Sequence, residues 1–198
     1  MNRFLALLAV ALIPCQLSGQ AAPGKKAGKA AAAPAAAPAA RTTAWKIQNA
    51  MSAAPASIAK NATIMDWPSS PTDTMKQLRA GTNGWTCMPD IPSTPGNDPM
   101  CLDKPWMKWA AAWMSHQPVQ ITEVGVGYML QGGSDASNTD PFKMKPDAPE
   151  KWVNSGAHVM VLTPNLETLA ALPTEYTGGG PWVMWKGTPY AHIMVPVK

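Results

Sequence analysis

The strongest constraint on the fold of this chain is a pair of cysteines that brackets a proline-rich segment. Cys87 and Cys101 are separated by Met88–Met100, which contains four prolines and no hydrophobic periodicity. Proline has no backbone N–H to donate to a helix or a sheet, so this segment needs a covalent brace to become ordered. We therefore predict a Cys87–Cys101 disulfide, which for a loop of this size stabilises the fold by about 3 kcal/mol. A redox-active or metal-binding pair would need closer spacing or further ligands nearby.

The N-terminus predicts export, and an oxidising compartment is where such a bridge persists. Residues 1–20 combine a short positive start with the apolar run Phe4–Ile13, which is too short to remain as a transmembrane helix. We interpret residues 1–20 as a secretory signal peptide, which makes the protein periplasmic or extracellular with no transmembrane segment in its mature form. The alternative is a lipid anchor on Cys15, although Pro14 fits a lipoprotein signal poorly.

Residues 21–44 are predicted to be a flexible linker, because residues 21–40 are almost entirely Ala, Pro, Gly and Lys and offer nothing to bury. Five of the 16 basic residues precede residue 45 and none of the 12 acidic residues does, so residues 45–198 carry 11 basic against 12 acidic side chains. The basic character of the chain therefore belongs to the tail, and the domain has no nucleic-acid signature. The basic linker either stays extended in solution or contacts an anionic polymer of the cell envelope.

Residues 45–198 suffice for one domain with a substantial core and are too few for two. The chain has nine tryptophans and 13 methionines against two phenylalanines, which favours an irregular, loop-rich fold. Helical and strand-like segments do not alternate regularly, which predicts a single small α+β domain with a mainly antiparallel sheet, short helices and long Pro/Gly-rich loops. The expected helices are residues 43–54, 104–116 and 163–172, the second of them with Asp103 as its N-cap. The expected strands are residues 62–67, 74–79, 119–130, 157–162, 182–185 and 190–195.

Five short sequences give the domain a likeness to other proteins. They are Gly84–Cys87, Pro95–Cys101, Gly132–Asn138, His158–Met160 and Gly187–His192. Together they span most of the domain, and as a set they resemble a family of small exported bacterial proteins with no assigned activity. The resemblance carries no activity, cofactor or site residue over to this chain, so its function has to be argued from its residues.

Each of the three histidines has a methionine two positions away in the sequence. Positions i and i+2 share a face in a strand but not in a helix, so the pair around His116, predicted on a helix, could not chelate a metal. If the other two strands are neighbours, their imidazoles and thioethers form a cluster that suits copper, with thioethers favouring Cu(I). The candidate metal ligands are His158, Met160, His192 and Met194. The alternative is that the methionines are core residues that fill gaps beside half-buried histidines.

A polar loop after residue 131 offers oxygen ligands for calcium, which is the second and weaker cofactor candidate. Asp135, Asn138 and Asp140 recur at short intervals, but such side chains also fold loops onto their own backbone, and the rest of an EF-hand pattern is missing. Asp98 in the segment between the cysteines is a weaker oxygen candidate of the same kind.

Catalytic motifs are scarce, with no G-x-S-x-G, H-E-x-x-H or P-loop pattern in the chain. Ser134 could be a nucleophile with His158 or His192 as its base; His192 as base and Asp135 as orienting acid are the leading candidates. The sequence favours a non-enzymatic exported binding or envelope-associated protein, with copper bound through His and Met as its most specific form. A small secreted hydrolase is the alternative.

Overall fold

The computed structural model describes residues 41–70 and 72–197, so the predicted signal peptide, Cys15 and the linker up to residue 40 lie outside the described residues. The main sheet contains β1 (Thr63–Asp66), β2 (Lys76–Arg79), β3 (Thr86–Met88), β4 (Met100–Leu102), β5 (Gly125–Met129), β8 (His158–Leu162), β9 (Trp182–Met184) and β10 (His192–Pro196). Their order is β2-β1-β3-β4-β5-β8-β10-β9, and the β1–β3 pair is parallel whereas the other neighbours are antiparallel. A separate two-stranded sheet joins β6 (Gly133–Asp135) and β7 (Val153–Ser155).

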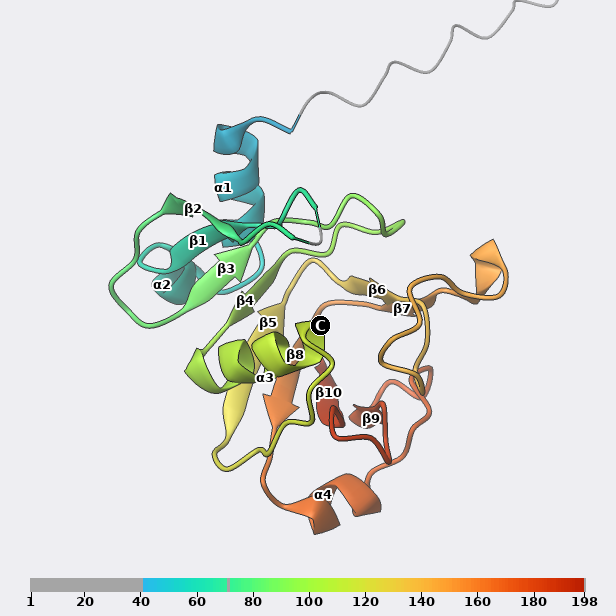
Figure 1. The fold of residues 1–198 in the computed structure, drawn as a ribbon. Helices are drawn as coiled ribbons and strands as arrows, with labels where there is room; N and C mark the ends of the chain where they lie inside the picture. Colours follow the sequence, from blue (N-terminus) through green and yellow to red (C-terminus); the bar gives the residue numbers. More distant parts are fainter. Residues whose placement is uncertain (1–40, 71, 198) are drawn as a thin grey trace, which may run out of the picture. The chain divides into compact units, whose positions relative to one another are not determined.

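The helices are few and short, which together with this sheet confirms the α+β prediction (Figure 1). They are α1 (Thr43–Met51), α2 (Ala56–Ala59), α3 (Lys104–Met114), the 3-10 helix η1 (Pro149–Lys151) and α4 (Leu166–Ala171). Within the described ranges, none of these helices has the length and apolar character needed to cross a membrane.

The two faces of the main sheet are covered by different elements. On one face, Ile64 and the two bonded cysteines form a core cluster with α1 and α2, and Ile193 lies in a second cluster with α4. Side chains alternate between faces along a strand, so Met88 and Met194 belong to a third cluster on the other face, together with α3. Long loops cover the rest of this second face, and the candidate site lies beneath them.

Helix α3 begins where Asp103 caps it, as the sequence predicts. The carboxylate of Asp103 accepts the backbone N–H of Trp106 at 3.0 Å and that of Val126 in β5 at 2.6 Å. A Cβ atom at Gly125 would lie 2.9 Å from Cβ of Pro105, so glycine lets the helix approach the strand closely. This approach buries the tryptophans of α3 against the sheet.

The predicted disulfide is present. Cys87 and Cys101 are directly opposite each other in β3 and β4, and a bond joins their sulfur atoms. The loop that they close is also ordered by polar contacts, which the sequence did not predict. The carboxylate of the buried Asp90 accepts the backbone N–H of Asp98 at 2.8 Å and forms an ion pair with Arg41.

The ordered structure extends into the range assigned to the linker. Helix α1 begins at Thr43, its N-cap is Thr42, and Arg41 pairs with Asp90. Residues 41–44 therefore belong to the folded domain.

The strand expected at residues 119–130 is shorter than predicted because both of its partners are short. Strand β4 ends at Leu102, opposite Gly127, and β8 ends at Leu162, opposite Gly125, so the segment before Gly125 has no strand to pair with. Val119 and Ile121 instead pack against the core from a loop. Helix α4 also starts later than residue 163, after its cap Asn165.

Candidate functional site

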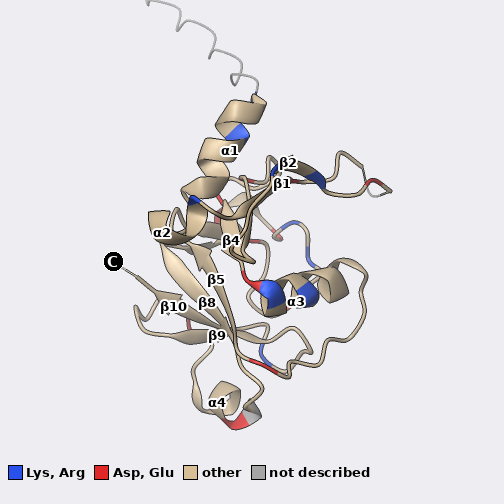
Figure 2. Cartoon of the chain, turned by 90° about the vertical axis from the view of Figure 1, so that its left-hand side faces the viewer, with Lys and Arg blue, Asp and Glu red and all other residues tan. Residues whose placement is uncertain are grey.

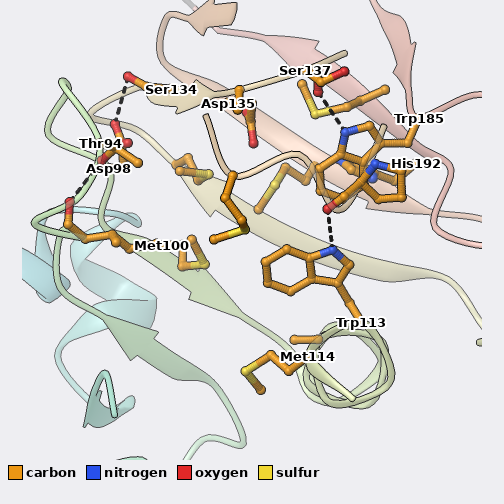
Figure 3. A pocket seen from close by; sticks show the side chains of 18 of the residues that line it. Thr94, Asp98, Met100, Trp113, Met114, Ser134, Asp135, Ser137, Trp185 and His192 are labelled. Atoms are coloured by element: carbon orange, nitrogen blue, oxygen red, sulfur yellow. Dashed lines mark hydrogen bonds between the residues drawn. The ribbon is translucent and has the colours of Figure 1, made fainter. Parts of the chain in front are cut away.

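A cavity of about 210 Å³ lies between α3, the second face of the sheet, the disulfide loop and the segment after β6 (Figure 3). Ten of the 13 methionines and six of the nine tryptophans line it. The methionines are Met75, Met88, Met100, Met107, Met114, Met129, Met144, Met160, Met184 and Met194, and the tryptophans are Trp67, Trp106, Trp109, Trp113, Trp152 and Trp185. An engineered cavity of about 150 Å³ binds benzene, so this one has room for a small organic molecule. The composition that the sequence analysis attributed to an irregular core thus gathers around a cavity.

Three tryptophans form one wall of the cavity with nearly parallel rings. The ring centroids of Trp109 and Trp185 are 5.8 Å apart with planes inclined by 4°, and Trp113 lies 6.3 and 6.2 Å from them. The indole N–H of Trp113 donates to the carbonyl of Pro141 at 2.8 Å, and that of Trp185 donates to the carbonyl of Ser137 at 2.9 Å (Figure 3). These bonds fix the two rings, so the wall is built before any ligand arrives.

Two carboxyl groups, from Asp98 and Asp135, lie away from this wall (Figure 3). Asp98 is only 3% exposed; its Oδ1 accepts the hydroxyl of Ser134 at 3.5 Å, and its buried Oδ2 has no partner in the described part of the chain. A Cβ at Gly96 would lie 2.5 Å from both Asp98 Oδ1 and Ser134 Oγ, so glycine lets the disulfide loop reach β6. The two acids are therefore brought together because the disulfide loop packs against strand β6.

The surroundings of both acids favour their protonated forms. Burial, and secondarily the charge of Asp98, raises the pKa of Asp135 to about 7. Asp135 borders the cavity, which is why part of its surface is accessible although protein surrounds the carboxyl group. Burial also raises the pKa of Asp98, and Asp90 adds to this shift whereas bonds from Thr94 and Ser134 oppose it.

His192 lines the cavity from β10, among the tryptophans. Its ring lies edge-on to Trp106, Trp109 and Trp185, with centroids 5.1, 5.5 and 5.2 Å away. Its Nδ1 is 2.9 Å from the carbonyl oxygen of Tyr190, which assigns the ring proton to Nδ1 and leaves Nε2 with a lone pair. Burial lowers the pKa of His192 to about 4, so this imidazole is neutral at physiological pH.

The structure brings three of the four predicted copper ligands to this cavity and separates the fourth. Met160 and Met194 are directly opposite each other in β8 and β10, and both line the cavity with His192. His158 is opposite Pro196, four residues along β10 from His192, which is an offset of about 13 Å. His158 borders a separate, smaller cavity instead. The strand register thus keeps the two histidines too far apart to ligate one ion.

The three predicted calcium ligands do not converge. Asp135 and Asp140 both border the cavity, but Asp140 accepts the backbone N–H of Phe142 at 2.9 Å. Asn138 does not line it and donates its amide N–H to the carbonyl of Thr174 at 2.8 Å. No three His, Cys, Asp or Glu side chains within residues 41–70 and 72–197 are placed to hold a metal ion. The polar side chains of this loop largely fold it onto neighbouring backbone, the alternative that the sequence left open.

Ser134, Asp135 and His192 share the cavity without forming a catalytic chain, and His158, the other predicted base, borders the smaller cavity instead. The Ser134 hydroxyl turns to Asp98, and Nδ1 of His192 turns to the Tyr190 carbonyl rather than to Asp135. Figure 3 shows Ser134 and His192 on opposite sides of Asp135. A serine nucleophile needs its base within hydrogen-bond reach and an acid behind that base. The arrangement favours binding over acyl transfer.

No family model, curated protein or solved structure matches this chain. The resemblance to small exported bacterial proteins therefore stays a prediction, and the cavity is the basis for a functional argument.

Proposed function

We propose that this chain is an exported binding protein for a small, largely apolar organic molecule that carries one polar group. The observation that supports this function best is the cavity, which combines a large apolar lining with three carboxyl groups, those of Asp98, Asp135 and the more exposed Asp140. Ligand sites in proteins are mostly apolar with a few polar groups that fix orientation, and this cavity follows that pattern. Export remains part of the proposal and rests on residues 1–20.

The lining suits a flat ligand body. The parallel rings of Trp109, Trp113 and Trp185 offer a surface on which a planar molecule stacks. The unbranched thioether side chains of the methionines adapt to the outline of such a molecule and make favourable contacts with its rings. The carboxyl groups of Asp98 and Asp135 would then orient its polar group.

We expect the purified chain to bind a two-ring probe, 1-naphthalenemethanol, with a change in tryptophan fluorescence because the probe contacts the tryptophan wall. Ala110 lines the cavity from α3, whereas Ala111 on the same helix is exposed. Ala110→Phe should fill the cavity and weaken binding by about tenfold or more, which corresponds to the loss of one well-packed apolar contact. Ala111→Phe is the matched control and should bind as the parent does. Equal binding by the two variants would place the probe elsewhere.

A second candidate function, Cu(I) binding, is supported by the soft ligands on the same wall. Nε2 of His192 is free while Nδ1 faces a backbone carbonyl, which is how metal-binding histidines are commonly oriented. Met160 and Met194 are adjacent to it on the same face of the sheet, and Met184 is its cross-strand neighbour. Neutral imidazole and thioether groups suit Cu(I).

If this candidate is correct, the chain should retain about one equivalent of Cu(I), measured by competition with a chromogenic chelator. Loss of an outer-shell partner alone costs about 10–100-fold in metal affinity, so His192→Ala should cost at least that. Met194→Ala should cost less because a thioether is the weaker donor. His116→Ala, which changes an exposed ring stacked on Phe142, is the control. Equal copper affinity in all these variants would exclude the site.

A further inference from the structure

We propose that the ligand of this cavity is an organic cation, an ammonium compound with a flat apolar body whose positive group pairs with Asp135 and Asp98. This inference rests on the proposed binding function and adds the charge of the ligand to it.

Negative side chains outnumber positive ones around the cavity. Asp98, Asp135 and Asp140 line it, and Lys143 is the one lysine or arginine that does so among the residues described. The ammonium of Lys143 is bonded to the carboxylate of Asp147 at 2.6 Å. Figure 2 shows other lysine and arginine positions on separate elements such as α1 and α3. The carboxyl pair is therefore not neutralised from within the cavity.

A neighbouring acid in the disulfide loop has a cation of its own. Arg41 pairs with Asp90, which lies behind Asp98 in the disulfide loop and accepts its backbone N–H. Asp90 thus has its own counter-ion, and Asp98 does not. This difference between neighbouring acids points to a cation supplied from outside the chain.

One carboxylate oxygen of the buried Asp98 side chain lacks a hydrogen-bond partner in the described part of the chain. Asp98 Oδ2 is buried without a hydrogen-bond donor among the described residues, and Asp98 as a whole is 3% exposed. Burying a carboxylate oxygen without a hydrogen-bond donor costs more free energy than burying a neutral polar group that lacks a partner. An ammonium group brings both N–H donors and positive charge, so it satisfies this oxygen and Asp135 together.

The tryptophan wall, which lies away from the two acids, also favours a cation. The faces of tryptophan rings carry negative electrostatic potential and attract cations, which favours an ammonium compound over a neutral one. An anion would meet two carboxyl groups and these ring faces, so it is disfavoured. An inorganic cation would leave the apolar volume unfilled and would lack a third acidic or histidine ligand within the described part of the chain.

Three probes that share one ring system test the charge of the ligand: 1-naphthylmethylamine, 1-naphthalenemethanol and 1-naphthoic acid. At pH 8 the amine should bind about tenfold tighter than the alcohol or more, because its bonds to carboxylates are charge-assisted, and the acid should bind least. In Asp135→Asn the ratio of amine to alcohol affinity should fall to about one. Asp73→Asn, which changes an exposed acid outside the cavity, should keep the ratio of the parent. Titration calorimetry on the purified chain measures all of these affinities.

The results with the three probes distinguish a failure of this inference from a failure of the proposed function. If none of the three probes binds, the binding function itself is wrong. If the alcohol or the acid binds as tightly as the amine, the ligand is not a cation, although the cavity still binds organic molecules.

A second measurement on the unmodified chain does not depend on the folding of any variant. Between pH 8 and pH 5, amine affinity should fall by about tenfold or more as Asp135 takes up a proton, while alcohol affinity stays constant. The other groups that face this region are Asp98, which titrates in the same direction, Asp140, which accepts the backbone N–H of Phe142, Lys143, which is bonded to Asp147, and His192. His192 stays neutral over this range because its pKa is about 4. The same pH dependence for both probes would overturn the inference.

Discussion

Asp135→Asn is expected to stabilise the fold at pH 8 by up to about 4 kcal/mol and to leave the free energy of unfolding at pH 4 nearly unchanged. Burial, with the charge of Asp98 second, raises the pKa of Asp135 from its ordinary value of 3.8 to about 7. The protonated carboxyl stabilises the folded state below pH 3.8, and this contribution is lost as pH rises through 7. Asparagine has nearly the same shape and cannot ionise, so the variant avoids the loss. Urea denaturation of parent and variant at both pH values measures the difference.

Parent and variant must be compared at the same pH, because His192 changes the free energy of unfolding with pH in the opposite direction to Asp135. Burial lowers the pKa of His192 from 6.5 to about 4, so its contribution to stability is present above pH 6.5 and is lost as pH falls through 4. Between these values the contributions of Asp135 and His192 to the pH dependence of stability offset each other. Asp73→Asn is the control and should change the unfolding free energy by less than about 0.5 kcal/mol at either pH. Equal stabilisation by Asp135→Asn at pH 4 and pH 8 would mean that this carboxyl is not desolvated.

The gain in stability expected for Asp135→Asn also bears on the function of Asp135. A residue that destabilises the folded chain at neutral pH has no structural purpose, since asparagine or serine would fill the same position at a lower cost. Perturbed acids of this kind are concentrated at functional sites. The position of Asp135 in the cavity, beside the unpartnered oxygen of Asp98, is consistent with that pattern.

The sequence predicted the elements whose signals are local. Asp103 before an amphipathic segment predicts the start of α3, and two cysteines around a proline-rich segment predict the disulfide. The cavity has no local signal. Asp98 comes from the loop between β3 and β4 and Asp135 from the end of β6, which pairs with β7, so the two acids are distant in sequence. Strand β6 has the sequence Gly-Ser-Asp, which lacks the alternation that indicates a strand.

The candidate copper ligands show that the face of a strand can be predicted from its sequence, whereas the pairing between two strands cannot. Positions two apart in a strand share a face, which correctly places Met160 with His158 and Met194 with His192. Which residues are opposite each other depends on the register between strands, and no feature of either strand determines it alone. The register sets Met160 against Met194 and leaves His158 against Pro196. The abundance of methionine and tryptophan was the signal for the cavity, and only the fold showed that these side chains gather in one place.

Trp109→Ala is expected to lower the free energy of unfolding by about 3–5 kcal/mol, the range for removing a buried tryptophan, and to abolish probe binding. Trp109 is 5% exposed, and its ring lies next to both other rings of the wall. The void that the variant leaves joins the cavity and cannot close, because Trp113 and Trp185 are held by hydrogen bonds from their indole N–H groups to loop carbonyls. The full loss of stability is therefore expected, because the surrounding side chains cannot move in to fill the void. Urea denaturation and the fluorescence titration measure the two effects.

Trp45→Ala is the matched control for this variant. Trp45 is 39% exposed on α1, outside the cavity, and its ring lies 4.9 Å from the guanidinium carbon of Arg41. Loss of an exposed cation–π contact costs about 0.5–1 kcal/mol, so this variant should stay folded and keep its affinity for the probe. If Trp109→Ala destabilises the chain no more than Trp45→Ala does, then the tryptophan wall is not part of the core. If Trp109→Ala is destabilised as expected and yet binds the probe with the affinity of the parent, the wall supports the fold and the ligand lies elsewhere.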